Sequence, residues 1–283
     1  MPSITRSKNA SGRVPVVVAL HCSGAGGYEW RHLTRVLGQR FQLIAPDLIG
    51  CGAAAPWTGT TPFTASDEAV RVVDIIDAAE GPVHLVGHSY GGAIALRAAL
   101  ERPARIASLA VYEPMALHVL KTAGADGRAA LEEITAFAAS IDRAVLCGAY
   151  WAAAELFVDH FNGAGAFAAM EPVAQASVVR YIPKACLEFR ALSEEPASLA
   201  DYRRLNFPTL LLVGDHAAEP ERLIGRQLAK AMTFASRRTV FGAGHMGPFT
   251  HQTIVNAMIA DHIIRAEPRV NADAPFDTTP LAA

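Results

Sequence analysis

The feature that most constrains the fold is an alternation of short, almost continuously apolar runs with segments of helical periodicity. Such runs, rich in β-branched and aliphatic residues, occupy positions 15–20, 41–45, 83–86 and 106–112. They lack the in–out alternation of a half-exposed strand, which is typical of parallel strands covered on both faces. The sequence therefore predicts an α/β fold with a mostly parallel central sheet and helices on both of its faces.

Helical segments separate these runs. Residues 66–79 place Ala69, Val72 and Ile76 on one face, with Ser66 positioned as the N-cap. Further helices are predicted over residues 28–37, 91–100, 221–232 and 253–264, and further strands over 209–213 and 238–241.

The stretch from residue 115 to residue 202 interrupts this rhythm. It has no convincing strand, many alanines and scattered aromatic residues. We interpret it as an inserted helical cap, so the predicted core domain comprises residues 1–114 and 203–283. The tail from Glu267 is rich in Pro, Asp and Ala and is expected to lie loosely on the surface.

Composition excludes several classes of protein. Hydrophobic residues make up 51% of the 283 positions, enough for a large core, and the net charge of −2 is unlike the basic footprint of a nucleic-acid binder. No stretch has the apolar length of a membrane span, and the polar N-terminus argues against a secretory signal. The four cysteines form no CxxC pair and no metal-ligand spacing, so we expect reduced thiols in a cytoplasmic protein without a metal.

The segment Gly87-His88-Ser89-Tyr90-Gly91 carries the strongest chemical signal. It is a G-x-S-x-G pattern that directly follows a predicted strand and directly precedes a predicted helix. A sharp strand-to-helix turn needs small neighbours and lifts the serine hydroxyl above the sheet at a helix N-terminus. The sequence therefore predicts Ser89 as a nucleophile.

From about residue 14 to residue 264 the chain resembles the α/β-hydrolase superfamily. The resemblance is carried by the order of four landmarks: His21-Cys22-Ser23-Gly24, Ala45-Pro46-Asp47-Leu48-Ile49-Gly50, the turn at Ser89, and Gly242-Ala243-Gly244-His245. Two positions depart from the usual pattern, since Cys22 replaces a glycine and Ile49 replaces an arginine. The resemblance implies a serine hydrolase that needs no metal or organic cofactor.

A serine hydroxyl needs a neighbouring base to become nucleophilic at neutral pH. His245 follows the last predicted strand in a glycine-rich loop, and it satisfies the superfamily order of serine, acid and histidine. We therefore predict His245 as the base. His88 is expected to point away from Ser89, and His21 resembles the histidine that supports the oxyanion loop.

Two carboxylates compete for the third position of the triad. Glu113 stands at the carboxyl end of the fourth strand, a placement that some relatives use, and a buried charge there needs a reason. Asp215 follows the next strand, close to the more usual position, which is occupied by Ala217. We favour Glu113 and keep Asp215 as the alternative.

Acyl transfer also needs backbone N–H donors for the developing oxyanion. The resemblance implies that Tyr90, the residue after the nucleophile, and Ser23, in the loop after the first strand, supply them. The expected reaction is hydrolysis of small, fairly apolar carboxylic esters through an acyl-enzyme. C–C bond, lactone and amide hydrolysis use the same residues, and a small-molecule receptor of the same fold is the alternative from another class. The expected partner is a small ester, not nucleic acid or a membrane, and a homodimer stays open.

Overall fold

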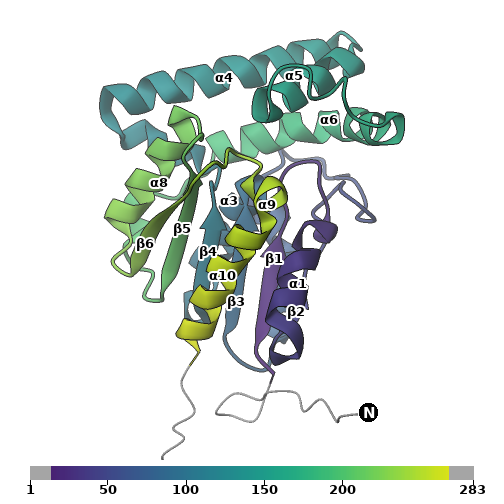
Figure 1. Cartoon of the computed structure of the whole chain (residues 1–283). Coiled ribbons are helices and arrows are strands. Elements are labelled where there is room, and N and C mark those ends of the chain that lie inside the picture. The colour runs from purple at the N-terminus through teal and green to yellow at the C-terminus, as the bar shows by residue number, and fades with distance from the viewer. Residues whose placement is uncertain (1–13, 268–283) are drawn as a thin grey trace, which may run out of the picture.

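The computed structural model describes residues 14–267. Six parallel strands form one sheet in the order β2-β1-β3-β4-β5-β6, which confirms the predicted α/β fold (Figure 1). The strands are β1 (Val16–Leu20), β2 (Gln42–Ile44), β3 (Val83–His88), β4 (Ile106–Tyr112), β5 (Thr209–Gly214) and β6 (Ala235–Val240). The interpretations of the first residues and of the tail beyond Glu267 lie outside the described range.

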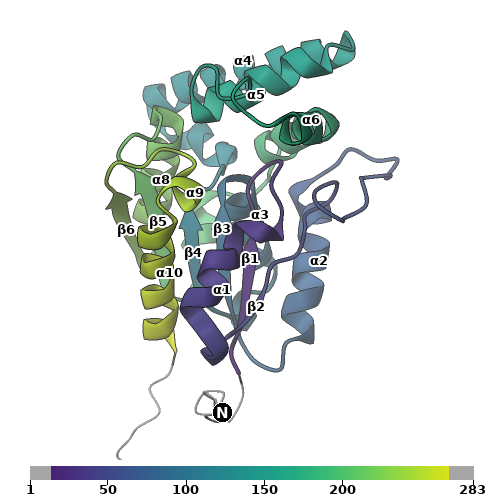
Figure 2. The same cartoon turned by 45° about the vertical axis from the view of Figure 1, so that its right-hand side comes forward.

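Helices cover both faces of the sheet. On one face α1 (Arg31–Leu37) lies against α10 (Gln252–Ala266), and the other face carries α2 (Ala65–Ala78), α3 (Ser89–Glu101) and α8 (Glu219–Ala231) (Figure 2). Successive strand residues serve opposite cores, as the strand period of two requires. In β1, for example, Val17 and Ala19 join the core under α1 and α10, whereas Val18 and Leu20 join the core under α2 and α3.

Two element boundaries differ from the prediction for identifiable reasons. Helix α2 starts at Ala65, and its N-cap is Thr64 rather than Ser66, because Thr64 and Asp67 form a reciprocal capping box. Strand β6 starts at Ala235, three residues before the predicted start. It is an edge strand whose arginines, Arg237 and Arg238, are exposed. Its apolar residues therefore cover only part of the strand and do not mark where it begins.

The chain between β4 and β5 is helical in every described element. It contains η4 (Leu117–Thr122), α4 (Gly124–Leu146), α5 (Tyr150–Asn162), α6 (Pro172–Ser193) and α7 (Leu199–Tyr202). Helices α4, α5 and α6 lie across the carboxyl ends of the strands, above the sheet in both cartoon views (Figures 1 and 2). Short helical turns complete the fold: η1 (Gly27–Trp30), η2 (Gly38–Arg40), η3 (Pro103–Arg105) and α9 (Gly247–Thr250).

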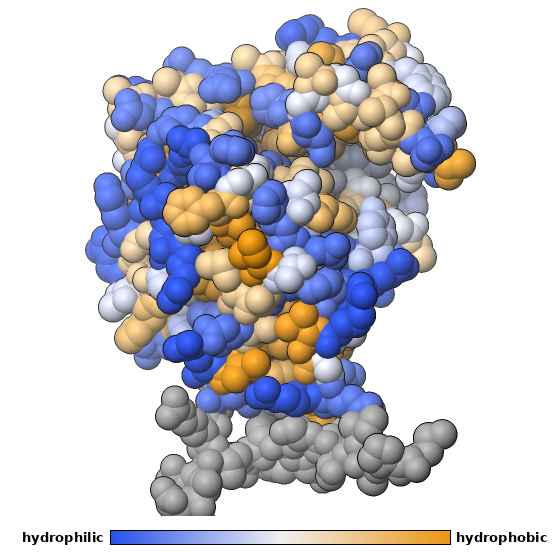
Figure 3. Space-filling view, in the orientation of Figure 1, coloured by the Kyte–Doolittle hydropathy of each residue, from blue (hydrophilic) through white to orange (hydrophobic). Residues whose placement is uncertain are grey.

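The face of the molecule in Figure 3 mixes hydrophilic and hydrophobic side chains, both on its upper part, where α4, α5 and α6 lie, and below it. Across residues 14–267, no helix combines the length and the apolarity that crossing a bilayer would need.

Candidate active site

Ser89 stands at the junction between β3 and α3 in a left-handed backbone conformation, with φ of 53°. The turn is too tight for side chains on either side of it. A Cβ atom on Gly87 would lie 2.5 Å from the carbonyl oxygen of Gly91, and one on Gly91 would lie 2.3 Å from that of His21. The glycines of the pattern are therefore a steric requirement, and the strain at Ser89 is held by the strand and the helix that flank it.

Glu113 occupies the equivalent point on the neighbouring strand, directly after β4. It too has a positive φ, of 41°, and it is 1% exposed. One carboxylate oxygen, Oε1, accepts a hydrogen bond of 2.7 Å from the backbone N–H of Gly214 at the end of β5. This leaves Oε2 free to face the loop that carries His245.

His245 joins the two residues into one hydrogen-bonded chain. Its Nε2 lies 2.8 Å from Ser89 Oγ and its Nδ1 lies 2.8 Å from Glu113 Oε2. An ionised carboxylate only accepts hydrogen bonds, so Nδ1 carries the proton and Nε2 accepts from the serine hydroxyl. This is the tautomer that a general base requires.

Asp215 does not take part in this chain. The hydrogen bond from His245 Nδ1 goes to Glu113, and the Oδ1 atom of Asp215 is buried without a hydrogen-bond partner among the described residues. Of the two candidate acids, the structure brings Glu113 to the imidazole.

The charge around His245 favours its protonated form. Burial opposes the imidazolium, but the hydrogen bond and the negative charge of Glu113 outweigh burial and raise the pKa of His245 above its ordinary value. Glu113 therefore stabilises a positive charge on the imidazole of His245.

A second buried pair stands behind the imidazole. His88 Nε2 donates to the backbone carbonyl of His245 over 2.8 Å, and His88 Nδ1 lies 2.8 Å from Glu29 Oε1. His88 thus points away from Ser89, as expected, and holds the loop of His245. Cys22 Sγ, Glu29 and His88 could together hold a metal ion, since their donor atoms lie within 4.8 Å of one another. The carboxylate is already engaged, however, by His88 and by the backbone N–H of Cys22.

The two residues expected to supply oxyanion donors, Ser23 and Tyr90, both line the same cavity as Ser89. The loop of Ser23 is anchored by His21, whose Nε2 accepts from the backbone N–H of Leu48 at 2.9 Å and whose Nδ1 bonds the carbonyl of Cys22 at 2.7 Å. Burial is the main factor that raises the pKa of the Cys22 thiol well above its ordinary value, which keeps this thiol of the cavity wall protonated.

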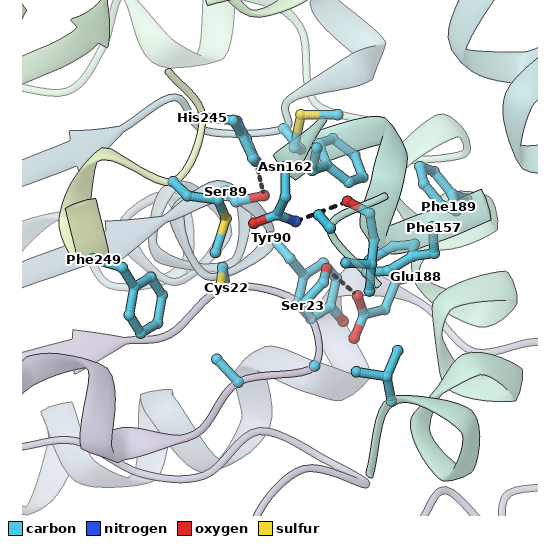
Figure 4. A pocket seen from close by; sticks show the side chains of 18 of the residues that line it. Cys22, Ser23, Ser89, Tyr90, Phe157, Asn162, Glu188, Phe189, His245 and Phe249 are labelled. Atoms are coloured by element: carbon cyan, nitrogen blue, oxygen red, sulfur yellow. Dashed lines mark hydrogen bonds between the residues drawn. The ribbon is translucent and has the colours of Figure 1, made fainter. Parts of the chain in front are cut away.

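Ser89 opens into a cavity of about 300 Å³ between the sheet edge and the helices above it (Figure 4). Its apolar walls come from the core and from α5 and α6: Met115, Phe157, Val158, Phe161, Val178, Phe189, Leu192, Met246 and Phe249. The centre of the Phe161 ring lies 4.9 Å from the centre of the His245 ring. Among the described lining residues, Glu188 is the one carboxylate and none is a lysine or arginine.

Sequence reasoning missed two charged residues on α6: Glu188, which lines the cavity, and Lys184, which is paired with it. The signal that could have found them is their i, i+4 spacing among apolar residues of an otherwise core-facing helix segment, where both are buried. A charged pair on an apolar helix face indicates a buried partner elsewhere in the fold.

Known proteins resemble the chain in sequence and in fold. Lipase LipV of Mycobacterium tuberculosis is 32% identical over 127 residues, which are 44% of this chain and 44% of that protein. A segment of polyketide synthase ThaQ of Burkholderia thailandensis is 28% identical over 258 residues, 85% of this chain and 11% of the synthase. The chain therefore matches less than half the length of each of these two relatives.

The fold has a similar counterpart in a solved thermophilic esterase from Thermogutta terrifontis, with a TM-score of 0.69, 20% identity, and coverage of 93% of this chain and 92% of that one. At this identity the likeness concerns the fold. The sequence profile of the family described as "Alpha/beta hydrolase family" matches residues 17–257, most of the chain. The chain belongs to the alpha/beta hydrolase family.

Proposed function

We propose that this hydrolase is a serine-dependent carboxylesterase that acts on small, fairly apolar esters through an acyl-enzyme. The observation that carries the proposal is the unbroken hydrogen-bonded chain from Glu113 through His245 to Ser89, with the serine facing a mainly apolar cavity. Nucleophile, base and orienting acid stand in hydrogen-bond contact, which is the arrangement that activates a serine hydroxyl.

The reaction follows from the positions of these groups. Ser89 Oγ attacks the ester carbonyl while His245 Nε2 takes the hydroxyl proton, and the negative charge moves to the carbonyl oxygen. The backbone N–H groups of Ser23 and Tyr90 stabilise that oxyanion. The imidazolium then passes its proton to the leaving alcohol, and the C–O bond breaks to give the acyl-enzyme. Water, deprotonated by His245, attacks the acyl-enzyme and releases the acid.

The cavity supports the substrate class. Its walls are mainly aliphatic and aromatic, so an apolar acyl or alcohol group gains the free energy of leaving water, about 0.8 kcal/mol per buried methylene. The absence of lysine and arginine from the described lining disfavours an anionic substrate. Lactone, amide and C–C substrates would use the same triad, and a receptor of this fold would retain it without turnover.

The test is a series of p-nitrophenyl esters of increasing acyl length, assayed with the wild type and with Ser89→Ala. We expect sustained release over many equivalents from the wild type and loss of about 10⁶-fold in kcat in Ser89→Ala. Release of one equivalent followed by arrest would favour the receptor. Faster turnover of lactones or amides than of any ester would be compatible with the same triad. It would show that the substrates are lactones or amides rather than esters.

A further inference from the structure

A buried ionic network lies beside the nucleophile and connects α6 of the upper layer to the core. Lys184 Nζ on α6 lies 2.7 Å from Glu68 Oε2 on α2 and 3.1 Å from Glu188 Oε1, one turn further along α6. All three side chains are at most 8% exposed. Two carboxylates therefore share one largely buried ammonium.

Each carboxylate also accepts a hydrogen bond from one of the two residues expected to form the oxyanion hole. Ser23 Oγ donates to Glu188 Oε2 over 2.6 Å, a bond visible in Figure 4, and Tyr90 Oη donates to Glu68 Oε2 over 2.8 Å. Ser23 lies in the loop after β1 and Tyr90 at the start of α3, and their side chains are thereby joined through a single ammonium group.

Further contacts hold the same parts together. Tyr181 on α6 donates to Glu188 Oε2 over 2.6 Å, and its ring lies against Gly24, where an added Cβ would meet ring carbon Cδ1 at 3.1 Å. The Lys184 ammonium lies 4.9 Å from the centre of the Tyr90 ring. Helix α6 thus touches the loop of Ser23 and the residue after the nucleophile at once.

Stability alone is a poor explanation for these charges. A buried ion pair gains little over well-packed apolar side chains of similar size, because desolvation offsets its Coulomb energy. A network with two carboxylates and one ammonium is less favourable still. Such a network does restrict the orientation of its side chains, since each hydrogen bond limits the distance and the angle between its two groups.

We propose that Lys184 is a positioning residue that joins α6 to both halves of the oxyanion hole, through Glu188 to Ser23 and through Glu68 to Tyr90. This proposal rests on the proposed function. The backbone N–H groups of Ser23 and Tyr90 are aligned when α6 is seated on the core, and the alignment is lost when it is not. The docking of α6 on the core and the alignment of the two oxyanion donors therefore occur together.

The variant that tests this is Lys184→Met, which keeps an unbranched apolar chain in place of the lysine stem and removes the ammonium. The matched control is Lys121→Met, because Lys121 also bonds α6, at the carbonyl of Ser193, and this hydrogen bond lies outside the network. Two readouts are needed: the rate at which a fluorophosphonate probe phosphonylates Ser89, and hydrogen–deuterium exchange of the described residues.

The probe reports on the hole directly. Ser89 Oγ displaces fluoride from phosphorus, His245 takes the serine proton, and the phosphoryl oxygen occupies the place of the oxyanion. Since removal of one oxyanion donor costs about 10²–10³-fold, we expect the displaced donors of Lys184→Met to slow labelling by about 10–100-fold. The esterase kcat should fall by a similar factor with little change in KM, and Lys184→Arg should recover part of the loss.

Exchange tests the coupling without any need for turnover. In Lys184→Met, amides of residues 22–25 and of α6 should exchange faster together, while those of β5 and α10 stay as in the wild type; Lys121→Met should change α6 alone. Unchanged exchange at residues 22–25, or normal labelling in Lys184→Met, would overturn the proposal. If the probe never labels Ser89 in the wild type, the proposed function is refuted instead. Hydrogen–deuterium exchange then still tests whether Lys184 couples α6 to residues 22–25.

If Lys184→Met does not fold, Ser23→Ala and Tyr90→Phe test the two branches, because each removes one hydroxyl from the edge of the network. Each should slow labelling about 3–10-fold, the effect of a hydrogen bond of about 1 kcal/mol. Slower labelling in both variants supports the proposed role of the network. Normal labelling in both would contradict it.

Discussion

The floor and the roof of the cavity are built by different means. On the floor, Ser89 and Glu113 are held by the backbone: each stands at the carboxyl end of a central strand with a positive φ. The roof, made by α5 and α6, is held by side chains, through the Lys184 network and through edge-to-face contacts such as that of Phe157 with Tyr181.

The comparison shows that different interactions position the residues of the floor and those of the roof. Strands β3 and β4 are neighbours in register, with His88 opposite Tyr112, so the residues that follow them, Ser89 and Glu113, are placed together by the hydrogen bonds of the sheet. No such ladder links α6 to the core, and its position depends on which side chains meet. We therefore expect the floor to decide nucleophilic attack and proton transfer, and the roof to decide selectivity and, through Lys184, the alignment of the oxyanion donors. The following experiments are ordered by expected effect.

The largest effect should come from the floor. Glu113→Gln should lower kcat by about 10⁴-fold, since an amide in place of the orienting carboxylate stabilises the wrong imidazole tautomer. The matched change Asp215→Asn should cost little, because Asp215 has no bond to His245. Steady-state kinetics on one p-nitrophenyl ester suffices. A greater loss in Asp215→Asn than in Glu113→Gln would reassign the acid.

Selectivity against anions should come from the roof. Glu188 faces the cavity from above, so an ester with a terminal carboxylate should have a kcat/KM about 10-fold or more below that of a neutral ester of equal length. The ratio of the two values should shrink in Glu188→Gln, even if both values fall through Ser23. An unchanged ratio in that variant would show that the charge of Glu188 does not reach the substrate.

Acyl-length preference should also follow the roof. Phe157→Ala enlarges the cavity from α5 and should shift the preferred p-nitrophenyl ester toward longer acyl chains, by about 10-fold in the ratio of kcat/KM for long and short esters. Trp151→Ala, an exposed aromatic on the same helix and 55% exposed, is the control. Equal shifts in both variants would indicate general loosening of the roof.

The smallest effect is a displacement of the acid limb of the pH profile. The raised pKa of His245 means that the base is lost as pH falls through a value above that of a free imidazole. Removing the negative charge in Glu113→Gln destabilises the imidazolium, so the acid limb of its residual activity should move to lower pH. A limb that moves to higher pH would contradict the assigned partner of His245.

Local sequence patterns were enough to predict much of the fold and of the turn at Ser89. Apolar runs predicted the parallel sheet, and the glycines around Ser89 predicted the turn, because steric limits at one turn are set by adjacent residues. The prediction was wrong at some element boundaries. The exposed arginines of β6 hid its start, and the capping box of Thr64 with Asp67 moved the start of α2.

The sequence by itself determined the fold class, the strand-to-helix turn at Ser89 and a short set of partners that included His245, Glu113 and Asp215. Only the tertiary structure placed Glu113, rather than Asp215, in hydrogen-bond contact with His245, because that contact depends on how β4, β5 and the loop of His245 meet. The same holds for Lys184, which lies 116 positions from Glu68 in the chain. Hydrogen bonds act over about 3 Å, so a pairing across such a separation exists only once the intervening chain has folded.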